Sequence, residues 1–177
     1  MMRNLQQQLV NYACYHRDPR NIRTHLIGVP LIVLAVATLL AGVPLAGVSV
    51  AHVAILLVVL YYLRLSRVLG ACMAVVMLLA LWGGIRLAAL PPPGGLLTGG
   101  GLFVLGWAFQ LLGHVYEGRK PAFVDDLVGL LIGPLFVLVE CLFRLGLLRG
   151  LQTEIEQQAG PVAVRRADHG HNGGGST

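Results

Sequence analysis

LIGVPLIVLAVATLL, residues 26–40, is the stretch that decides the fold, because it contains no charged residue and approaches the length of a membrane-spanning helix. A bilayer core about 30 Å thick requires roughly 20 apolar residues in one helix. Long apolar runs follow at 44–63 and 69–90, and a fourth, which ends at Leu112, begins between residues 96 and 102. The sequence therefore predicts four clear transmembrane helices.

A fifth apolar run, at 127–148, differs from the others because Pro134 lies in its middle and Glu140 in its second half. Proline disrupts helical hydrogen bonding, and a carboxylate is costly inside a membrane. We expect this segment to be kinked, re-entrant or interfacial. We also predict one membrane-embedded helical domain over residues 1–151 and a polar, disordered tail over residues 152–177.

The composition is typical of a membrane protein. Of the 177 residues, 56% are hydrophobic and 12% are charged, and the mean hydropathy is +0.74. Soluble domains carry about twice that charged fraction, so a water-soluble fold is excluded. Three scattered cysteines support neither a disulfide framework nor a zinc ribbon. The N-terminus lacks the pattern of a cleaved signal peptide, so we expect an all-α, multi-pass integral membrane helical bundle that retains its first apolar run.

Basic residues account for the net charge of +5, and most of them lie in short segments beside the apolar runs. We interpret this placement as membrane orientation and expect no nucleic-acid partner. Arginines precede the first run and follow the second, and EGRKP follows the fourth, whereas the turns at 41–44 and 91–101 are uncharged. By the positive-inside rule the charged ends are cytoplasmic. We expect a bacterial inner-membrane protein, or one of the endoplasmic reticulum in a eukaryote.

Three histidines are predicted to meet on the cytoplasmic side. His16 and His25 flank the proline-containing turn in YHRDPRNIRTH, and the break in the helix lets their side chains converge. His114 and Glu117 are three residues apart and share one helical face. Three imidazoles with a nearby carboxylate suit a divalent transition metal, and open coordination positions suit iron that activates oxygen. Interfacial anchoring or helix capping explains the same residues without a metal, and both interpretations stay open here.

Other ionisable residues have competing explanations. We expect His52 near the middle of the second apolar run, as a functional group or as a neutral histidine bonded to a neighbouring helix. His169 and His171 lie in the glycine-rich tail, which we expect to be solvated. Asp125 and Asp126 precede the fifth run, where helix capping and a catalytic role are both open.

Two stretches resemble the membrane 2-hydroxy fatty acid dioxygenases, a family of fungal phytosphingosine-degradation enzymes and bacterial relatives long catalogued as a domain of unknown function. They are YHRDPRNIRTHLIGVP at 15–30 and GWAFQLLGHVYEGRKPAFVDDLVGLLIGPLFVLVECLFRLG at 106–146. The order H, N, H, P and then GH, E, R, PA is long and unusual. The second and third apolar runs match only in hydropathy, and Asp126 stands where the family commonly has asparagine.

The resemblance implies an iron(II)-dependent dioxygenase that shortens a 2-hydroxy fatty acid by one carbon, as in fatty acid α-oxidation, with dioxygen and without an organic cofactor. It assigns metal ligation to His16, His25 and His114, adds Glu117 as a catalytic candidate, and places Asn21 nearby as an orienting residue. His52 lies outside the shared motifs. Arginine offers bidentate geometry for the substrate carboxylate, and the candidates are Arg17, Arg20, Arg23 and Arg119. Membrane lipid is an expected partner, and a homo-oligomer is compatible with this family.

A non-enzymatic membrane scaffold or a small transporter is the alternative function. Its helices would pack through small residues such as Gly83 and Gly84. A transporter needs polar residues along a pathway near the membrane midplane, whereas most polar residues here are expected at one interface. This difference favours the enzyme.

Overall fold

The computed structural model describes residues 4–121 and 128–164, and helices dominate this part of the chain. The helices are α1 (Leu5–Ala13), α2 (Pro19–Ala41), α3 (Val50–Leu65), α4 (Arg67–Ala88), α5 (Gly94–Glu117), α6 (Gly129–Arg144) and α7 (Arg149–Ala159). A short antiparallel hairpin of β1 (Pro44–Leu45) and β2 (Val48–Ser49) links α2 to α3, with Pro44 opposite Ser49 and Leu45 opposite Val48. The predicted all-α membrane helical class is confirmed.

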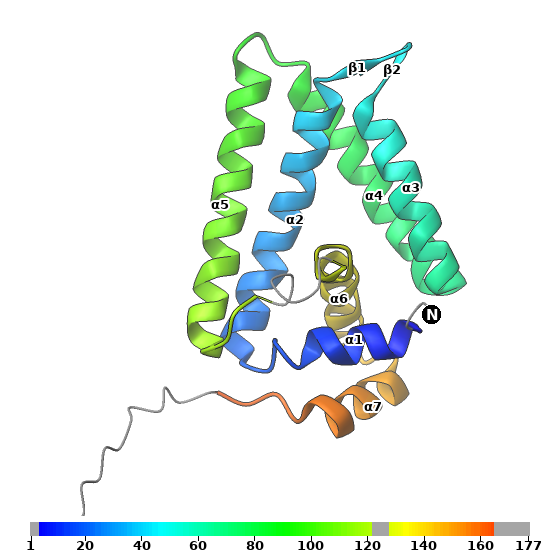
Figure 1. Ribbon diagram of the computed structural model, residues 1–177, viewed down its shortest axis with the longest axis vertical. Helices are drawn as coiled ribbons and strands as arrows, with labels where there is room; N and C mark the ends of the chain where they lie inside the picture. Colours follow the sequence, from blue (N-terminus) through cyan, green and yellow to red (C-terminus); the bar gives the residue numbers. More distant parts are fainter. Residues whose placement is uncertain (1–3, 122–127, 165–177) are drawn as a thin grey trace, which may run out of the picture.

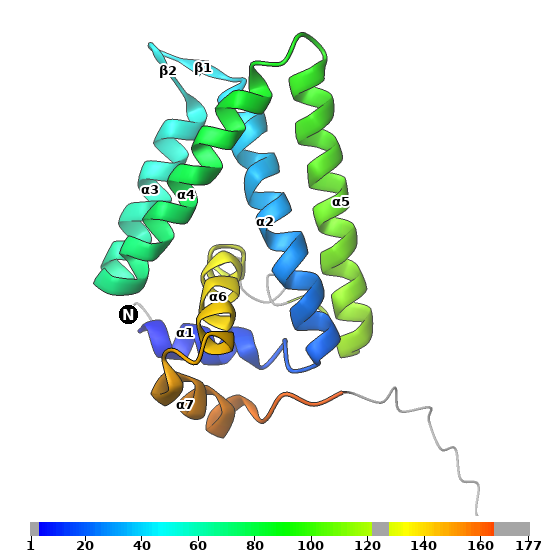
Figure 2. The ribbon, with the colours of Figure 1, turned by 180° about the vertical axis from the view of Figure 1, so that it is seen from behind.

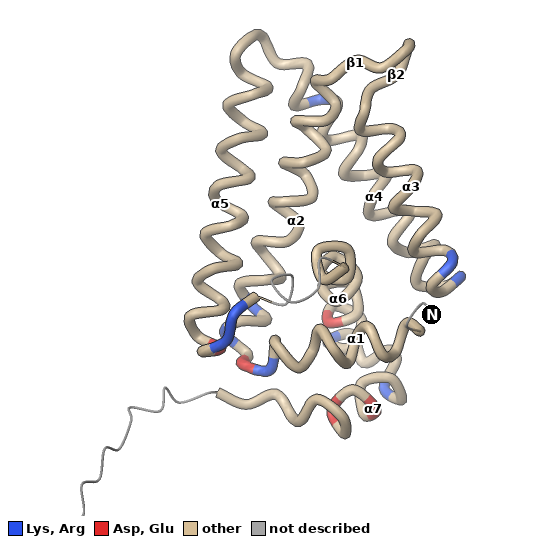
Figure 3. Tube along the Cα trace, viewed as in Figure 1, with Lys and Arg blue, Asp and Glu red and all other residues tan. Residues whose placement is uncertain are grey.

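The helices form an upright group and a layer across one of its ends. The upright group consists of α2, α3, α4 and α5, and the hairpin lies at its far end (Figure 1). Helices α1 and α7 lie across the opposite end, and the reverse view shows the same arrangement (Figure 2). Lys and Arg gather mainly at this second end, although Arg86 lies in the last turn of α4 at the far end (Figure 3). The molecule therefore has one charged end and one largely apolar body.

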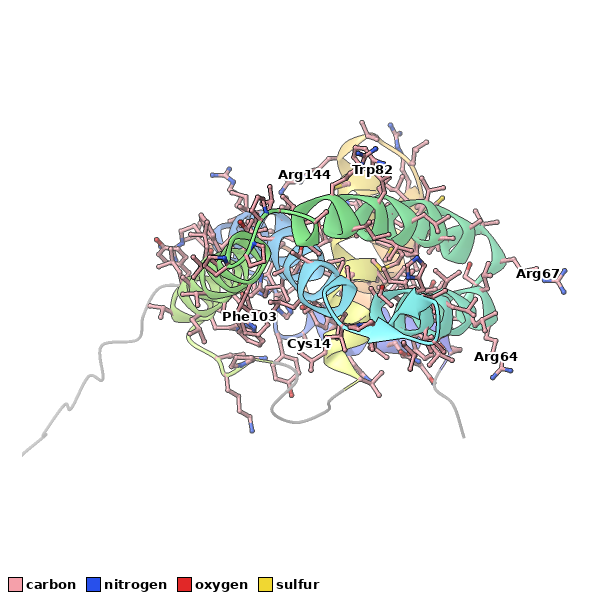
Figure 4. All side chains as sticks on the ribbon, turned by 90° about the horizontal axis from the view of Figure 1, so that it is seen from above. Cys14, Arg64, Arg67, Trp82, Phe103 and Arg144 are labelled. Atoms are coloured by element: carbon pink, nitrogen blue, oxygen red, sulfur yellow. The ribbon has the colours of Figure 1, made fainter. Side chains whose placement is uncertain are left out.

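Helix α6 also runs across the upright helices. It is seen almost end-on in Figure 1 and lengthwise from above in Figure 4, so its axis crosses the direction of α2 and α5. The same view shows Arg64 and Arg67 extending outward from the end where α3 meets α4. We refer to α1, α6 and α7 together as the base layer. Its position at the charged end explains why the fifth apolar run contains a proline and a glutamate.

Three helices are long and apolar enough to cross a bilayer, namely α2, α4 and α5. Helices α6 and α7 pass the same test only as a pair, and the chain bends by 117° at the break between them. The bend therefore lies at the end of the fifth run, whereas Pro134 lies inside the single helix α6. Helix α3 has 16 residues and is shorter than the predicted run at 44–63, because residues 44–49 form the hairpin. Ala46 and Gly47 both have positive φ and make its turn.

Glycines allow α2 and α5 to pack closely along their length. Gly99, Gly106 and Gly113 recur every seven residues on α5 and face α2. A Cβ on Gly106 would lie only 2.7 Å from Ile32 Cγ1 and 2.9 Å from the carbonyl oxygen of Gly28. Small residues at such spacing bring helix backbones together in membranes. This contact fixes the end of α5 against the start of α2.

The base layer is held together by its own apolar core. α6 buries one apolar stripe at the i, i+3, i+4, i+7 spacing of an amphipathic helix, made of Ile132, Leu135, Phe136 and Val139. The residues of α1 buried in the same core are Leu9, Val10, Tyr12 and Ala13. α7 adds Ile155, which is only 1% exposed. Burying this stripe against α1 keeps α6 at the end of the bundle.

The disordered tail was predicted to begin at residue 152, but the chain is helical at that point. Residues 149–159 form α7, and Leu151 and Ile155 give this mostly polar helix an apolar edge that packs against the base layer. The remainder of the expected tail, from residue 165 onward, lies outside the described residues. The division of the chain into a single membrane-embedded domain and a tail stays a prediction.

Candidate metal centre

The link between α1 and α2 brings two histidines together. Asp18 caps α2 by accepting the backbone N–H of Arg20 at 2.8 Å, and Pro19 occupies the first helical turn, where its missing N–H is harmless. The chain turns back at this point, so His16 in the link faces His25, which lies about two turns into α2. Their Nε2 atoms are 3.1 Å apart.

His114, near the end of α5, completes the group. One nitrogen from each of His16, His25 and His114 lies within 4.8 Å of the others, and the ring centroids are 4.5 to 5.1 Å apart. The exposed fractions are 0%, 1% and 8%, respectively. We call these three residues the histidine cluster. The structure thus brings together the three histidines that the sequence singled out.

Backbone carbonyls determine which nitrogens of two rings face the cluster. His16 Nδ1 donates to the carbonyl oxygen of Tyr12 at 2.7 Å, and His25 Nδ1 donates to that of Asn21 at 3.0 Å. A carbonyl oxygen only accepts, so the proton of each neutral ring is on Nδ1. Burial, and next the neighbouring His25, hold the pKa of His16 well below its ordinary value. The lone pairs of two Nε2 atoms therefore face each other.

This arrangement fits a transition-metal ion. Two facing lone pairs repel unless a cation lies between them. Nitrogens bound about 2.1 Å from one ion are about 3 to 3.5 Å apart, and the 3.1 Å separation of the two Nε2 atoms agrees with that. Nδ1 of His114 is buried and has no hydrogen-bond partner among the described residues. Imidazole nitrogens are common ligands of divalent zinc, copper, iron and nickel.

Glu117 contacts the link before α2. Its carboxylate accepts the backbone N–H of Arg17 at 3.0 and 3.1 Å, the backbone N–H of Asp18 at 2.8 Å, and Nδ2 of Asn21 at 3.0 Å. Negative charge is favourable at the N-terminus of a helix. Asn21 Nδ2 also donates to the carbonyl oxygen of Tyr15 at 3.2 Å. Glu117 and Asn21 therefore tie the end of α5 to the link that contains the first histidine.

Arg17 is buried and engaged with the protein on several sides. Its Nε donates to the carbonyl oxygens of Ala13 and His16, each at 3.0 Å, and its Nη1 donates to that of Gly160 at 3.2 Å. Its Nη2 lies 3.9 Å from a carboxylate oxygen of Glu140 on α6. Arg17 thus joins the link to α6 and to the end of α7.

The other candidate arginines lie closer to the surface. The guanidinium of Arg20 pairs with the Asp18 carboxylate through two contacts, at 3.0 and 2.8 Å. Nη1 of Arg119 donates to the carbonyl oxygen of Cys14 at 3.0 Å. Arg23 is exposed on α2. Three of the four arginines proposed for a substrate carboxylate therefore bind groups of the protein itself.

His52 is far from the histidine cluster. It lies in the first turn of α3, and its Nδ1 accepts the backbone N–H of Ser49 at 3.2 Å and contacts the Ser49 hydroxyl at 2.9 Å. The expectation that His52 lies midway along a helix is wrong, because the hairpin takes up the start of that run. The other candidates of the sequence analysis lie outside the described residues: Asp125, Asp126, His169 and His171.

The whole membrane region is similar to one known family. Residues 2–145 match the family model described as 2-hydroxy-palmitic acid dioxygenase Mpo1-like. The chain belongs to the Mpo1-like family. It is 34% identical over 158 residues to the 2-hydroxy-palmitic acid dioxygenase MPO1 of Saccharomyces cerevisiae, covering 86% of this chain and 88% of that protein. The family resemblance is confirmed. No solved structure matches the chain.

In this Mpo1-like protein a cavity of about 90 Å³ opens beside the histidine cluster. His25 and His114 line it together with Tyr12 and Gln110. Gln110 is 7% exposed, and its Nε2 has no hydrogen-bond partner within the described chain. Gln110 was not among the residues expected from the sequence, although its four-residue spacing from His114 places both on one helical face. The cavity therefore combines the histidines with a buried amide in a mostly apolar wall.

Proposed function

We propose that this Mpo1-like protein is an iron(II)-dependent dioxygenase that shortens 2-hydroxy fatty acids by one carbon. The observation that supports the metal is the buried histidine cluster, in which two unprotonated nitrogens face each other at 3.1 Å. The yeast relative is named for 2-hydroxy-palmitic acid and for a dioxygenase reaction. The cluster and the family membership together favour this chemistry over a scaffold or a transporter.

His16, His25 and His114 would hold the ion. When bound, iron(II) supplies the redox chemistry that activates dioxygen and a positive charge that attracts the 2-hydroxyl and carboxylate oxygens of the substrate. Within the described chain, no carboxylate belongs to this group of potential ligands. Three neutral imidazoles leave the charge of a divalent ion unbalanced, so the site favours an anionic substrate.

The proposed reaction balances without a further reductant. Cleavage of the bond between C1 and C2 of the 2-hydroxy acid, with uptake of one dioxygen, leaves a carboxylic acid one carbon shorter, carbon dioxide and water. All the electrons that reduce dioxygen come from the substrate. The protein therefore needs no organic electron donor beside the metal.

The residues around the cluster hold the ligands and the substrate in place. The carbonyl groups of Tyr12 and Asn21 keep protons on Nδ1 and leave Nε2 of His16 and His25 available. Glu117 acts as a positioning residue, because its carboxylate fastens the link that contains His16.

We assign the first protein contact of the substrate head group to Gln110. No arginine is among the described residues that line the cavity, whereas the Gln110 amide is buried in its wall. An amide N–H donates readily to a carboxylate or hydroxyl oxygen. Arg17, Arg20 and Arg119 would then stabilise the protein around the site, and Arg23 would face the interface.

The charged end of the molecule suggests how the protein lies in the membrane. We propose a multi-pass topology in which the base layer lies at the cytoplasmic surface of a bacterial inner membrane, or of the endoplasmic reticulum in a eukaryote (Figure 3). A long-chain hydroxy acid lies in lipid with its carboxylate at the interface. The histidine cluster, at the same end of the upright helices, would meet that head group.

The test is turnover by the purified protein. The protein is prepared in detergent without oxygen, loaded with iron(II), and then given dioxygen and 2-hydroxypalmitate, and the products are analysed by mass spectrometry. We expect an acid one carbon shorter, formed only with oxygen and iron and abolished in His25→Ala. Absence of product from folded, iron-loaded protein with several hydroxy-acid lengths would refute the function.

A further inference from the structure

An apolar groove adjoins the cavity beside the histidine cluster. Its volume is about 360 Å³, and it runs between α2, α3, α5 and α6. The cavity and the groove share five lining residues: Ile32, Val33, Trp107, Leu130 and Pro134. The two spaces therefore lie side by side along these residues, and the histidines lie on the cavity side.

We propose that this groove binds the hydrocarbon chain of the 2-hydroxy fatty acid, with the head group at the histidine cluster and the chain end near Leu40 and Ala51. The inference rests on the proposed function and adds to it where the substrate chain lies and what limits its length. The groove shares part of its lining with the cavity beside His25 and His114, and this position points to the substrate chain as the occupant.

The lining is polar at the cavity end and apolar along the groove, as the substrate is polar at its head group and apolar along its chain. Gln110 and the histidines lie at the cavity end. The described lining of the groove contains no charged residue, and the hydroxyl of Tyr62 is used in a hydrogen bond of 2.6 Å to the carbonyl oxygen of Leu131. Each buried methylene contributes about fourfold to affinity, so a long acyl chain gains much from such a wall.

The length of the path suits a fatty acid. His25, at the cavity, and Leu40, in the groove, are fifteen residues apart on α2, which corresponds to about 22 Å along the helix. One leaflet, half of a bilayer core about 30 Å thick, is about 15 Å deep, and its acyl chains span that depth. The cavity and groove together can therefore hold an extended long chain.

The groove is open along its side. Val36, Phe103 and Leu130 line it and are 39%, 38% and 49% exposed. In a membrane these residues face hydrocarbon, so a chain can move sideways from the lipid into the groove while its head group stays at the interface. No passage through water is needed for the apolar part of the substrate.

The test fills the distant part of the groove and compares substrate lengths. Ala54 lines the groove on α3, and Ala71 is exposed on α4, so Ala54→Phe and Ala71→Phe make a matched pair. We expect Ala54→Phe to lower kcat/KM for 2-hydroxypalmitate roughly tenfold or more, since the new ring would occupy the space in which several methylenes of the substrate are buried. Turnover of 2-hydroxyoctanoate should stay unchanged, and Ala71→Phe should match the parent protein with both acids.

A second variant keeps the proposal testable if Ala54→Phe does not fold. Leu40→Ala enlarges the distant end of the groove and should shift the preference towards acids longer than 2-hydroxypalmitate. If both groove variants keep the chain-length profile of the parent protein, or if Ala54→Phe affects short and long acids equally, the proposed path is wrong.

Binding measurements separate this inference from the proposed reaction. Displacement of a fluorescent fatty acid from the iron-loaded protein measures the affinity for each hydroxy acid without turnover. If the parent protein turns over neither acid, the reaction fails, but weaker binding of 2-hydroxypalmitate to Ala54→Phe alone still supports the groove. Equal displacement by a diacyl phospholipid would instead identify the occupant as ordinary membrane lipid and overturn the proposal.

Discussion

Replacement of Glu117 by alanine should destabilise the protein even when no metal is bound. The carboxylate accepts three N–H groups, those of the Arg17 and Asp18 backbones and of the Asn21 side chain. Each buried donor that loses its acceptor costs about 1 to 3 kcal/mol, so Glu117→Ala should lower the free energy of unfolding by roughly 3 to 9 kcal/mol. A domain is stable by only about 5 to 15 kcal/mol, so this loss is large.

Thermal unfolding in detergent measures the effect, in iron-free buffer and again with iron(II). A loss of 3 kcal/mol corresponds to a decrease in Tm of at least about 6 °C for a chain of this size. Glu117→Gln keeps an acceptor oxygen but loses the charge, and it should lose about half as much stability, since charge-assisted hydrogen bonds are roughly twice as strong as neutral ones. Glu154→Ala, at an exposed glutamate of α7, is the matched control.

The positioning role of Glu117 would be refuted if Glu117→Ala unfolded at the parent temperature without metal but no longer gained stability from iron(II). That result would make Glu117 a metal ligand and not a positioning residue. Equal decreases in Glu117→Ala and the Glu154→Ala control would also contradict it.

Three further substitutions test other parts of the account. Gly113→Ala places a methyl group against Thr24 and Asn21, so it should cost about 1 to 3 kcal/mol and lower iron affinity, as measured by thermal unfolding and metal titration. Gln110→Leu should raise KM for 2-hydroxypalmitate about tenfold, through loss of one hydrogen bond to a charged group, with iron content unchanged. His52→Ala should lower stability by about 1 kcal/mol at most and leave turnover intact.

Much of the fold is predictable from the sequence because lipid imposes a length and a polarity on each helix. The runs that became α2, α4 and α5 are predominantly apolar and long enough to cross a bilayer. The hairpin at 44–49 was missed because its residues are as apolar as the helix that follows it. α7 was missed because its apolar edge is short, and only the base layer buries Ile155.

The histidine cluster is predictable in membership but not in detail. The proline after His16 and the family motifs indicated that His16, His25 and His114 meet. Spacing placed Glu117 on the helical face of His114, but it could not tell that the carboxylate would meet backbone N–H groups of the link. Those donors become available only when α5 packs against the start of α2, a tertiary contact that depends on glycines such as Gly113.

Iron(II) binding to the apoprotein without oxygen is the most direct test of the central claim that three histidines form a metal site. Titration of the purified chain should give one ion per chain, and binding should be lost in His16→Ala, His25→Ala and His114→Ala. His52→Ala, a histidine outside the cluster, should bind as the parent protein does. Equal iron binding by the parent protein and all three cluster variants would contradict the account.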